Sequence, residues 1–154
     1  MTIRICEPKD SEQVLRLVTS VLAKEFPEDQ SAYATNDLER LTETYQGPAN
    51  VFFIAEEGNQ IIGTCGVKAD GEKTAILRRL FVDPHYRGRG IGFKLLQESL
   101  GFCRRQGFEE VVIRTSNRME QAVRLCRLLG FSENGSWTFG DVTLSLYRLR
   151  LQSK

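Results

Sequence analysis

The sequence predicts an α/β fold, a mixed sheet of about seven strands with helices on both faces. Three observations support this prediction. β-rich segments separated by short turns fill the chain between residues 51 and 82. Helical periodicity alternates with short apolar runs after residue 90. The run Thr74–Val82 leads through a helix into Val111–Arg114, and such a crossover makes two strands parallel.

Length, charge and cysteine content narrow the class of protein. A chain of 154 residues has the length of one domain, so we expect a single domain over residues 1–154. The net charge of +1 predicts neither a nucleic acid nor a membrane surface as a partner. The N-terminus is typical of a strand rather than a signal peptide. Four scattered cysteines and a single histidine favour a cytoplasmic protein without a metal site.

The N-terminal third is expected to form one strand and two helices. Alternating apolar residues predict a strand over Thr2–Glu7, and a helix follows with Asp10 or Ser11 as its N-cap. Leucines at helical spacing predict a second helix over about Ala34–Tyr45, which the Gly47-Pro48 pair ends.

The middle of the chain is expected to form a β-meander. Val51–Glu57 and Gln60–Lys68 are β-rich runs, and the Gly58-Asn59 pair between them is a hairpin signal. A turn at Asp70-Gly71 then leads into a third strand over Thr74–Val82.

Helices and strands alternate in the last part of the chain. Asn117 is expected to be a helix N-cap, because Glu120 follows it at capping-box spacing. Gly107 and Gly130 each precede a phenylalanine, a pattern typical of a left-handed cap at the end of a helix. The expected elements are a helix over Gly90–Gln106, a strand over Val111–Arg114, a helix over Asn117–Leu129, and a hairpin of Trp137–Phe139 and Val142–Leu149.

A glycine-rich loop at Arg87-Gly88-Arg89-Gly90-Ile91-Gly92 joins a strand to a helix and carries the strongest functional signal. Such a loop exposes consecutive backbone N–H groups at the positive end of a helix, which suits a pyrophosphate group. Arg87, Arg89 and Lys94 add positive charge nearby. From the glycines alone, a turn that binds nothing is the alternative. The spacing matches neither the GxGxxG dinucleotide fingerprint nor the GxxxxGK[ST] phosphate-binding loop.

The same segment resembles the GNAT superfamily of N-acetyltransferases. Arg87-Gly88-Arg89-Gly90-Ile91-Gly92 matches the family signature (Gln/Arg)-x-x-Gly-x-(Gly/Ala). The strand Leu77–Pro84 precedes it as in that family, and Thr115–Met119 with Ala122–Phe131 is similar to the second family segment beside coenzyme A. The resemblance extends over essentially the whole chain, with sharp motifs only from about Ile76 to Phe131.

The resemblance implies an enzyme that transfers the acetyl group of acetyl-CoA to a primary amine by direct attack on the thioester. The strand at Leu80–Val82 would carry a β-bulge and splay away from Val111–Arg114, leaving a slot for the cofactor. The Val82 N–H would polarise the thioester carbonyl, and Asn117 would lie beside the pantetheine arm. The implied cofactor-binding residues are Leu80, Phe81 and Val82 along the pantetheine, and Arg87, Gly88, Arg89, Gly90, Ile91 and Gly92 at the pyrophosphate.

The sequence departs from the family at both proton-transfer positions. Ile76 stands where many members have Glu, and Cys126 stands where many have the Tyr that protonates coenzyme A. Cys126 is a candidate proton donor, with a small buried core cysteine as the alternative interpretation, and Tyr147 or Tyr86 could replace it. The base stays open among Glu72, Glu56 and water leading to Asp83 or His85, although His85 is more typical of an exposed loop.

Three questions therefore stay open at the level of the sequence. The acceptor is a small-molecule or peptide amine of unknown identity, and a homodimer is possible because dimers are common in the family. A non-catalytic acyl-CoA-binding module is the alternative function, because the usual Glu and Tyr are missing.

The two neighbouring arginines Arg78 and Arg79 are expected to point to opposite faces of the sheet, because side chains alternate along a strand. One of them would then lie near the phosphates of coenzyme A.

Overall fold

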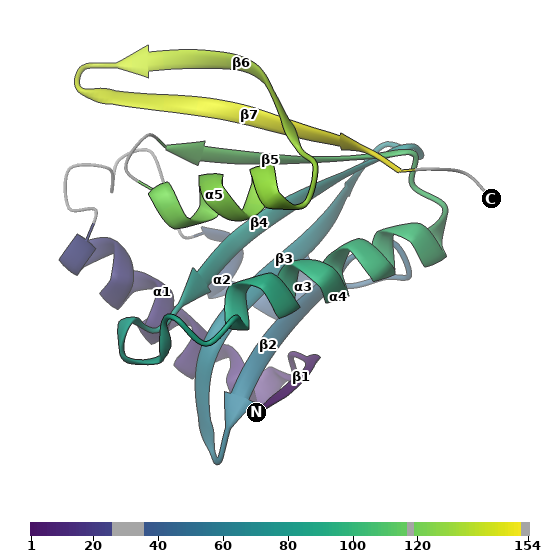
Figure 1. The fold of residues 1–154 in the computed structure, drawn as a ribbon. Helices are drawn as coiled ribbons and strands as arrows, with labels where there is room; N and C mark the ends of the chain where they lie inside the picture. The colour runs from purple at the N-terminus through teal and green to yellow at the C-terminus, as the bar shows by residue number, and fades with distance from the viewer. Residues whose placement is uncertain (26–35, 117–118, 152–154) are drawn as a thin grey trace.

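The computed structural model describes residues 1–25, 36–116 and 119–151, and it confirms the mixed α/β fold (Figure 1). Within these residues the strands form one seven-stranded sheet in the order β1-β2-β3-β4-β5-β7-β6. The strands are β1 (Thr2–Ile5), β2 (Val51–Glu57), β3 (Gln60–Asp70), β4 (Thr74–Val82), β5 (Glu110–Ser116), β6 (Ser132–Phe139) and β7 (Val142–Arg150).

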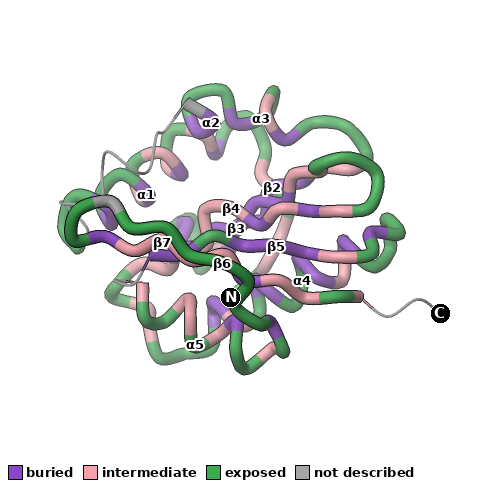
Figure 2. The backbone as a smooth tube through the Cα atoms, turned by 90° about the horizontal axis from the view of Figure 1, so that it is seen from above, coloured by how far each residue is buried: buried purple, intermediate pink, exposed green. Residues whose placement is uncertain are grey.

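Helices cover both faces of this sheet, as Figure 2 shows with the buried residues concentrated between the two helical layers. One hydrophobic cluster packs the first three helices against the sheet, and a second packs the last two helices against the opposite face. The helices are α1 (Ser11–Glu25), α2 (Asn36–Glu39) and α3 (Leu41–Thr44) on one face, and α4 (Ile91–Gln106) and α5 (Glu120–Leu128) on the other.

The parallel pair predicted from the crossover is present between β4 and β5, and it is incomplete. Pairing runs from Thr74 opposite Glu110 to Leu77 opposite Ile113 and then stops, although both strands continue. Figure 1 shows the two strands diverging beyond that point, with α5 lying across the gap. The predicted splay is therefore confirmed, and the position where pairing ends is the closed end of the gap.

A β-bulge in β4 accompanies the splay. Arg78 pairs with Gly66 and Phe81 pairs with Thr64, so two residues of β4, Arg79 and Leu80, face one residue of β3. Arg79 has a φ of 59°, in the left-handed region that residues with side chains rarely adopt. The buried Thr64 hydroxyl donates a 2.6 Å hydrogen bond to the Arg79 carbonyl oxygen. The expected bulge thus lies at the start of the Leu80–Val82 segment.

The single helix expected over Ala34–Tyr45 is wrong, because the backbone leaves the helical region at Arg40 and two short helices form instead. Residues 34 and 35 lie outside the described residues. In an unbroken helix, residues eight apart lie about 12 Å from each other along the axis. The break lets the Tyr45 hydroxyl donate to the Asp37 carboxylate at 3.0 Å.

One predicted helix start needs correction, and a second helix starts at the expected place but with a different contact at the expected cap residue. Helix α5 has Met119 as its N-cap rather than Asn117, which lies outside the described residues. The reason is that β5 stays paired with β7 as far as Ser116, two residues beyond the predicted end of that strand. Helix α1 begins at Ser11 after a short 3-10 turn, and the Asp10 carboxylate accepts from the Glu7 N–H at 2.8 Å instead of capping α1.

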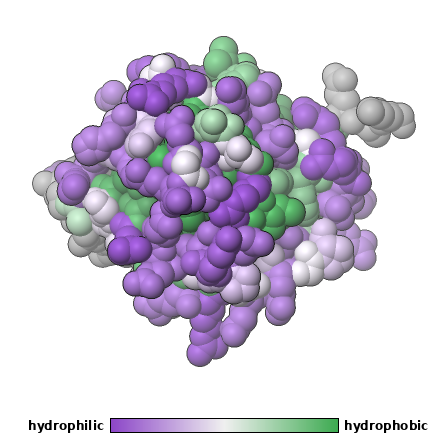
Figure 3. Space-filling model, turned by 90° about the horizontal axis from the view of Figure 1, so that it is seen from below, coloured by the Kyte–Doolittle hydropathy of each residue, from purple (hydrophilic) through white to green (hydrophobic). Residues whose placement is uncertain are grey.

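The glycine cap expected after α4 is confirmed. Gly107 has a φ of 83°, and its N–H donates to the Arg104 carbonyl oxygen at 3.1 Å. Phe108 packs back into the core with only 6% of its surface exposed. Across the described helices, none has the length and apolar character needed to cross a lipid bilayer. The surface seen from below is mostly hydrophilic, with apolar residues showing between the polar ones (Figure 3).

Gly66 on β3 is required by packing rather than by backbone geometry. A Cβ atom there would lie 2.8 Å from Tyr45 Cε1 and 2.9 Å from Phe52 Cδ2. Both rings are buried and pack edge to face with centroids 5.0 Å apart, so neither can move freely.

We predict that Gly66→Ala lowers the free energy of unfolding by about 1–3 kcal/mol, because the added methyl group must displace one of these rings. Urea denaturation followed by circular dichroism measures the change. Gly101→Ala in α4 is the matched control, since its new methyl group meets only the movable Arg105 guanidinium. Alanine at that helical position should leave stability equal or raise it by about 1 kcal/mol. Equal midpoints for both variants would contradict the packing argument.

Candidate functional site

Three adjoining cavities form a continuous slot between β4, β5, α5 and the glycine-rich loop. The first two share Val82, Gly92 and Leu125, and the first and third share Met119 and Ala122. We call this feature the slot. It runs from the loop, along the free edge of β4, to the place where β4 and β5 begin to pair.

The loop end of the slot has the backbone geometry that an anion needs. Gly88 and Gly90 have φ values of 82° and 76°, a region that glycine occupies at little cost. Gly90 is the N-cap of the sixteen-residue helix α4. The first N–H groups of a helix have no intrahelical partner, and they line one wall of the cavity around this loop.

The positive charge at the loop comes from two arginines on different elements. Arg87 donates from Nε to the Val82 carbonyl oxygen at 3.2 Å and also pairs with Glu25 at the end of α1. Arg124 of α5 lines the same cavity from the other side. Arg89 turns instead toward the Tyr86 ring, with its guanidinium 5.1 Å from the ring centroid.

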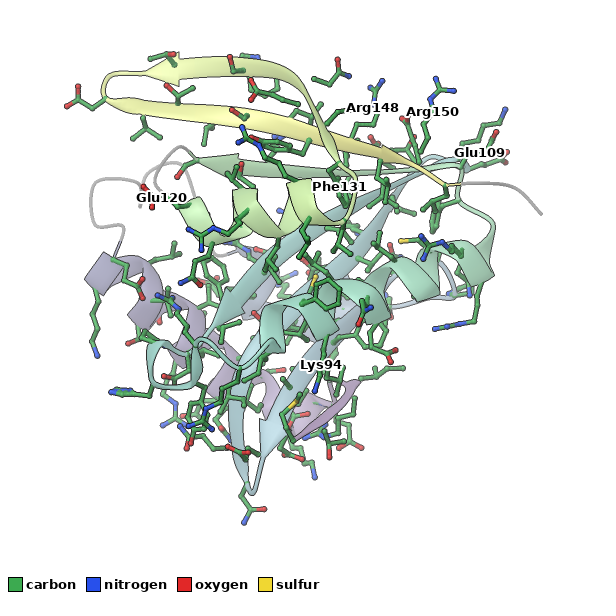
Figure 4. All side chains as sticks on the ribbon, in the orientation of Figure 1. Lys94, Glu109, Glu120, Phe131, Arg148 and Arg150 are labelled. Carbon is green, nitrogen blue, oxygen red and sulfur yellow. The ribbon has the colours of Figure 1, made fainter. Side chains whose placement is uncertain are left out.

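Lys94 does not contribute to the loop as the sequence suggested. It lines a separate groove with Met1 and Ile3. Figure 4 shows Lys94 on the side of α4 that faces away from α5, while Glu120 lies at the start of α5.

The backbone of Val82 points into the slot. The Asp83 N–H donates to the Ile62 carbonyl oxygen at 2.8 Å, which makes Val82 and Gly63 a non-hydrogen-bonded pair of the antiparallel ladder. The N–H and C=O of Val82 are therefore directed away from β3, and the bond from Arg87 to the Val82 carbonyl agrees with this direction. With β5 splayed away, the edge of β4 offers its amide to a ligand.

A buried ion pair supports the bulge at the inner end of the slot. Arg79 donates to the Asp37 carboxylate at 2.6 Å and 3.1 Å, and both side chains are less than a tenth exposed. Burial alone would raise the pKa of Asp37, but the hydrogen bonds from Arg79 and Tyr45 and the charge of Arg79 hold that pKa below its ordinary value. The pair ties α2 to the strand that borders the slot.

The prediction that Arg78 and Arg79 point to opposite faces is wrong, because the bulge interrupts the alternation of β4. Arg78 lies opposite Gly66, on the face that Tyr45 covers, and its charge also lowers the pKa of Asp37. Arg79 reaches Asp37 on that same face. Neither arginine lines the cavity around the glycine-rich loop.

The candidate proton donors lie at different distances from the slot. Cys126 has no exposed surface, belongs to the main hydrophobic cluster and lines none of the three cavities of the slot. Burial raises the pKa of its thiol to about 12. Tyr147 lines a separate cavity beside α5, with its hydroxyl 3.4 Å from a Glu133 carboxylate oxygen. The Tyr86 hydroxyl contacts Gln60.

None of the four candidate bases has a side chain in the walls of the slot. Glu56 pairs with Arg4 at 3.0 Å, and Glu72 lies in the turn between β3 and β4, at the opposite end of β4 from Val82. The Asp83 carboxylate accepts from the His85 N–H at 2.9 Å. The His85 side chain is 83% exposed, as expected for a loop residue.

Sequence reasoning did not single out the individual contacts of Asp37, Arg124 and Thr115, although it placed Thr115 and Arg124 in the segments beside coenzyme A. Asp37 is 42 positions from Arg79 in the chain, so no local pattern links them. Arg124 follows Glu120 by one helical turn and shares its face of the helix, and this spacing could have indicated that Arg124 lies near the slot.

Among the described residues, no group of three His, Cys, Asp or Glu side chains lies close enough together to hold a metal ion.

Comparison with known proteins gives a consistent answer. The sequence model described as Acetyltransferase (GNAT) family matches residues 15–131. The chain is 30% identical over 127 residues to N-acetyltransferase 8F1 of Rattus norvegicus, covering 79% of the chain and 58% of that protein. It is 36% identical over 109 residues to N-acetyltransferase 8B of Homo sapiens, covering 67% and 48%. The chain spans about half the length of the curated relatives it matches.

Solved structures share the fold at lower identity. A GNAT-family acetyltransferase from Staphylococcus aureus Mu50 superposes with a TM-score of 0.84 at 24% identity, covering 98% of this chain and 99% of that one. An acetyltransferase from Salmonella typhimurium, solved with its cofactor acetyl-CoA, gives a TM-score of 0.81 at 23% identity, covering 100% and 95%. These likenesses extend over the whole sheet and both helical layers.

We predict that Asp37→Asn lowers the free energy of unfolding at neutral pH by about 3–5 kcal/mol, because it leaves the Arg79 guanidinium buried without a counter-charge. The wild-type advantage should shrink as the pH falls through the lowered pKa of Asp37, since the carboxyl then becomes neutral. Urea denaturation at several pH values between neutral and acidic measures both effects.

Glu39→Gln is the matched control, because Glu39 is an exposed residue of the same short helix. This substitution should change stability by less than about 0.5 kcal/mol. If Asp37→Asn were equally mild, the ion pair would not support the fold around the bulge.

Proposed function

The chain belongs to the GNAT acetyltransferase family, and from that premise we propose that it transfers an acetyl group from acetyl-CoA to a primary amine of a small molecule or peptide. One observation carries the proposal. A strand edge with free amides leads directly into a glycine-rich loop at the N-terminus of a long helix. An extended arm that ends in a diphosphate matches both parts of this surface.

The residues of the slot fit coenzyme A chemically. We propose that the backbone N–H groups of Arg87–Gly92 hold the pyrophosphate, with charge from Arg87 and Arg124. Leu80, Phe81 and Val82 would pair with the pantetheine arm, and all three line the slot together with Met119 and Leu125 of the opposite wall. The assignment of Asn117 to the pantetheine concerns a residue outside the described ones and stays a proposal from the family resemblance.

The reaction needs no covalent enzyme intermediate. The amine nitrogen forms a bond to the thioester carbon, the carbon–sulfur bond breaks, and the bonding electron pair leaves with sulfur. The nitrogen loses one proton and the sulfur gains one, so protons balance without an external acid. The Val82 N–H, directed into the slot, would stabilise negative charge on the carbonyl oxygen as it develops.

Charge around the slot suggests the kind of amine. Of the acidic residues around it, Glu25 is paired with Arg87 and Asp37 with Arg79, while Glu120 lines the slot at the start of α5. Arg78 and Arg114 line the splay, and no ion pair within 4 Å joins either of them to a carboxylate of the described residues, although the charge of Arg78 also acts on Asp37. We propose that this distribution favours amines that also carry a carboxylate, such as amino acids and peptides, over polyamines.

Between Tyr147 and Cys126, we propose Tyr147 as the proton donor. The cavity that Tyr147 lines shares Thr115 with the slot, whereas Cys126 is enclosed by core side chains.

All strands of the described residues belong to one continuous sheet. This supports our proposal of a single acetyltransferase domain over residues 1–154.

We predict that the protein releases thiol from acetyl-CoA in the presence of an amino acid or peptide amine, and does so more slowly with polyamines. Gly92→Val should raise the KM for acetyl-CoA by about tenfold or more, because its side chain would extend toward Leu125 and Val82 across the slot. A thiol-reactive dye follows the release, and Gly101→Ala on the solvent side of α4 is the control.

Two outcomes would contradict this proposal. Saturable binding of coenzyme A without turnover of any amine would favour the non-catalytic binding module. Unchanged acetyl-CoA affinity in Gly92→Val, with its fold intact, would show that the cofactor does not use the slot.

We predict that Cys126→Ala retains turnover within about twofold while lowering stability by about 1 kcal/mol, because the thiol fills core volume and does not reach the slot. Tyr147→Phe should reduce kcat by about tenfold to a hundredfold if its hydroxyl protonates the leaving thiolate. Steady-state kinetics beside thermal denaturation separates the two effects. The reverse pattern, with a loss of kcat only in Cys126→Ala, would return the proton-donor role to the cysteine.

A further inference from the structure

The side chain of Thr115 on β5 carries a buried hydroxyl that has no hydrogen-bond partner in the described part of the chain. The residue is 1% exposed. The other buried side-chain atom without a hydrogen bond there is Arg148 Nε, which lies 3.3 Å from the Glu110 carboxylate. The Glu110 charge therefore compensates for the missing hydrogen bond at Arg148, whereas the Thr115 hydroxyl is uncharged and gains nothing from an ion pair.

Other buried hydroxyls of the fold are satisfied. Thr64 donates to the Arg79 carbonyl oxygen at 2.6 Å, and Ser99 donates to the Leu95 carbonyl oxygen at 2.8 Å. An unsatisfied buried hydroxyl costs about 1–3 kcal/mol, whereas valine has nearly the same shape and suits a strand equally well. The fold alone therefore gives no reason for a hydroxyl at position 115.

The location of Thr115 supplies a reason. It lies on β5 just beyond Ile113, the last residue that pairs with β4, and it lines the part of the slot inside the splay. The same side chain also borders the cavity that contains Tyr147. The hydroxyl is thus at the closed end of the slot, across from the bulge at Arg79 and Leu80.

A ligand arm that starts at the glycine-rich loop and follows β4 can extend only until β4 and β5 pair. An arm that fills the slot would place its tip inside the splay, in the stretch bounded by Val82, the bulge and Thr115. If the slot holds acyl-CoA, as the proposed function states, the tip is the thioester. This step rests on the proposed function.

We propose that the Thr115 hydroxyl donates a hydrogen bond to the sulfur of acyl-CoA and to the thiolate that leaves. A hydrogen bond to an anion is stronger than one to a neutral thioester, so the contact strengthens as the carbon–sulfur bond breaks. The hydroxyl keeps its own proton throughout. Thr115 touches a reacting atom and so acts as a catalytic residue in a chain whose family tyrosine is replaced by Cys126.

The test compares coenzyme A with desulfo-coenzyme A, which lacks the sulfur atom, by calorimetry on wild-type protein and Thr115→Val. The variant should bind coenzyme A about threefold to tenfold more weakly and bind desulfo-coenzyme A as the wild type does. Its kcat should fall by about tenfold or more. Its stability in urea should equal or exceed that of the wild type, because an unsatisfied hydroxyl has been removed.

Thr115→Ser gives the opposite pattern, which excludes a general effect of misfolding. Serine keeps the hydroxyl and loses a buried methyl group, so stability should fall while coenzyme A affinity and kcat stay within about twofold. Thr138→Val, on an exposed part of β6, is the control that should change nothing.

Equal weakening of both ligands in Thr115→Val would overturn the assignment to sulfur, since the hydroxyl would then contact another part of the arm. No weakening of either ligand with unchanged kcat would overturn the site altogether. Failure of the wild-type protein to bind either ligand would be a separate result, and it would remove the proposed function itself.

Discussion

Strands β4 and β5 cannot pair along their whole length, because β4 carries two residues where β3 offers one, opposite Cys65. The extra residue turns the end of β4 away from β5 and leaves backbone amides without a partner in the sheet. In most proteins such an edge is covered or charged, since unpaired amides invite association. Here the exposed stretch is short, borders α5, and leads into the glycine-rich loop, so a small extended ligand fits it better than another strand.

The bulge is maintained against a backbone preference by contacts on both sides. Arg79 adopts a conformation that costs about 1–3 kcal/mol for a residue with a side chain. The Thr64 hydroxyl holds its carbonyl oxygen, and Asp37 holds its guanidinium inside the layer formed by α2 and α3. The two short helices are therefore part of the architecture of the slot, even though they lie on the opposite face of the sheet from α5.

The sequence predicted the structure correctly where the pattern was local. Strand β4 was predicted with its observed bounds, and the parallel pair and the loop before α4 followed from spacing and glycine placement. The sequence did not predict contacts between residues whose interaction depends on the rest of the fold. The helix over residues 34–45 breaks at Arg40 so that Asp37 and Tyr45 can meet, and strand alternation failed at Arg79 because a bulge depends on the register of the neighbouring strand. The missing partner of Thr115 likewise becomes visible only in three dimensions.

The contact between Arg87 and Glu25 joins the glycine-rich loop to the end of α1, far away in the sequence. Any anion that recruits this guanidinium must share it with a carboxylate that already neutralises it. Thermodynamic linkage then makes the two interactions reciprocal. An anion that binds the loop weakens the ion pair between Arg87 and Glu25, and a change that stabilises this ion pair lowers the affinity of the loop for the anion. The position of the first helix therefore depends on whether the loop is occupied.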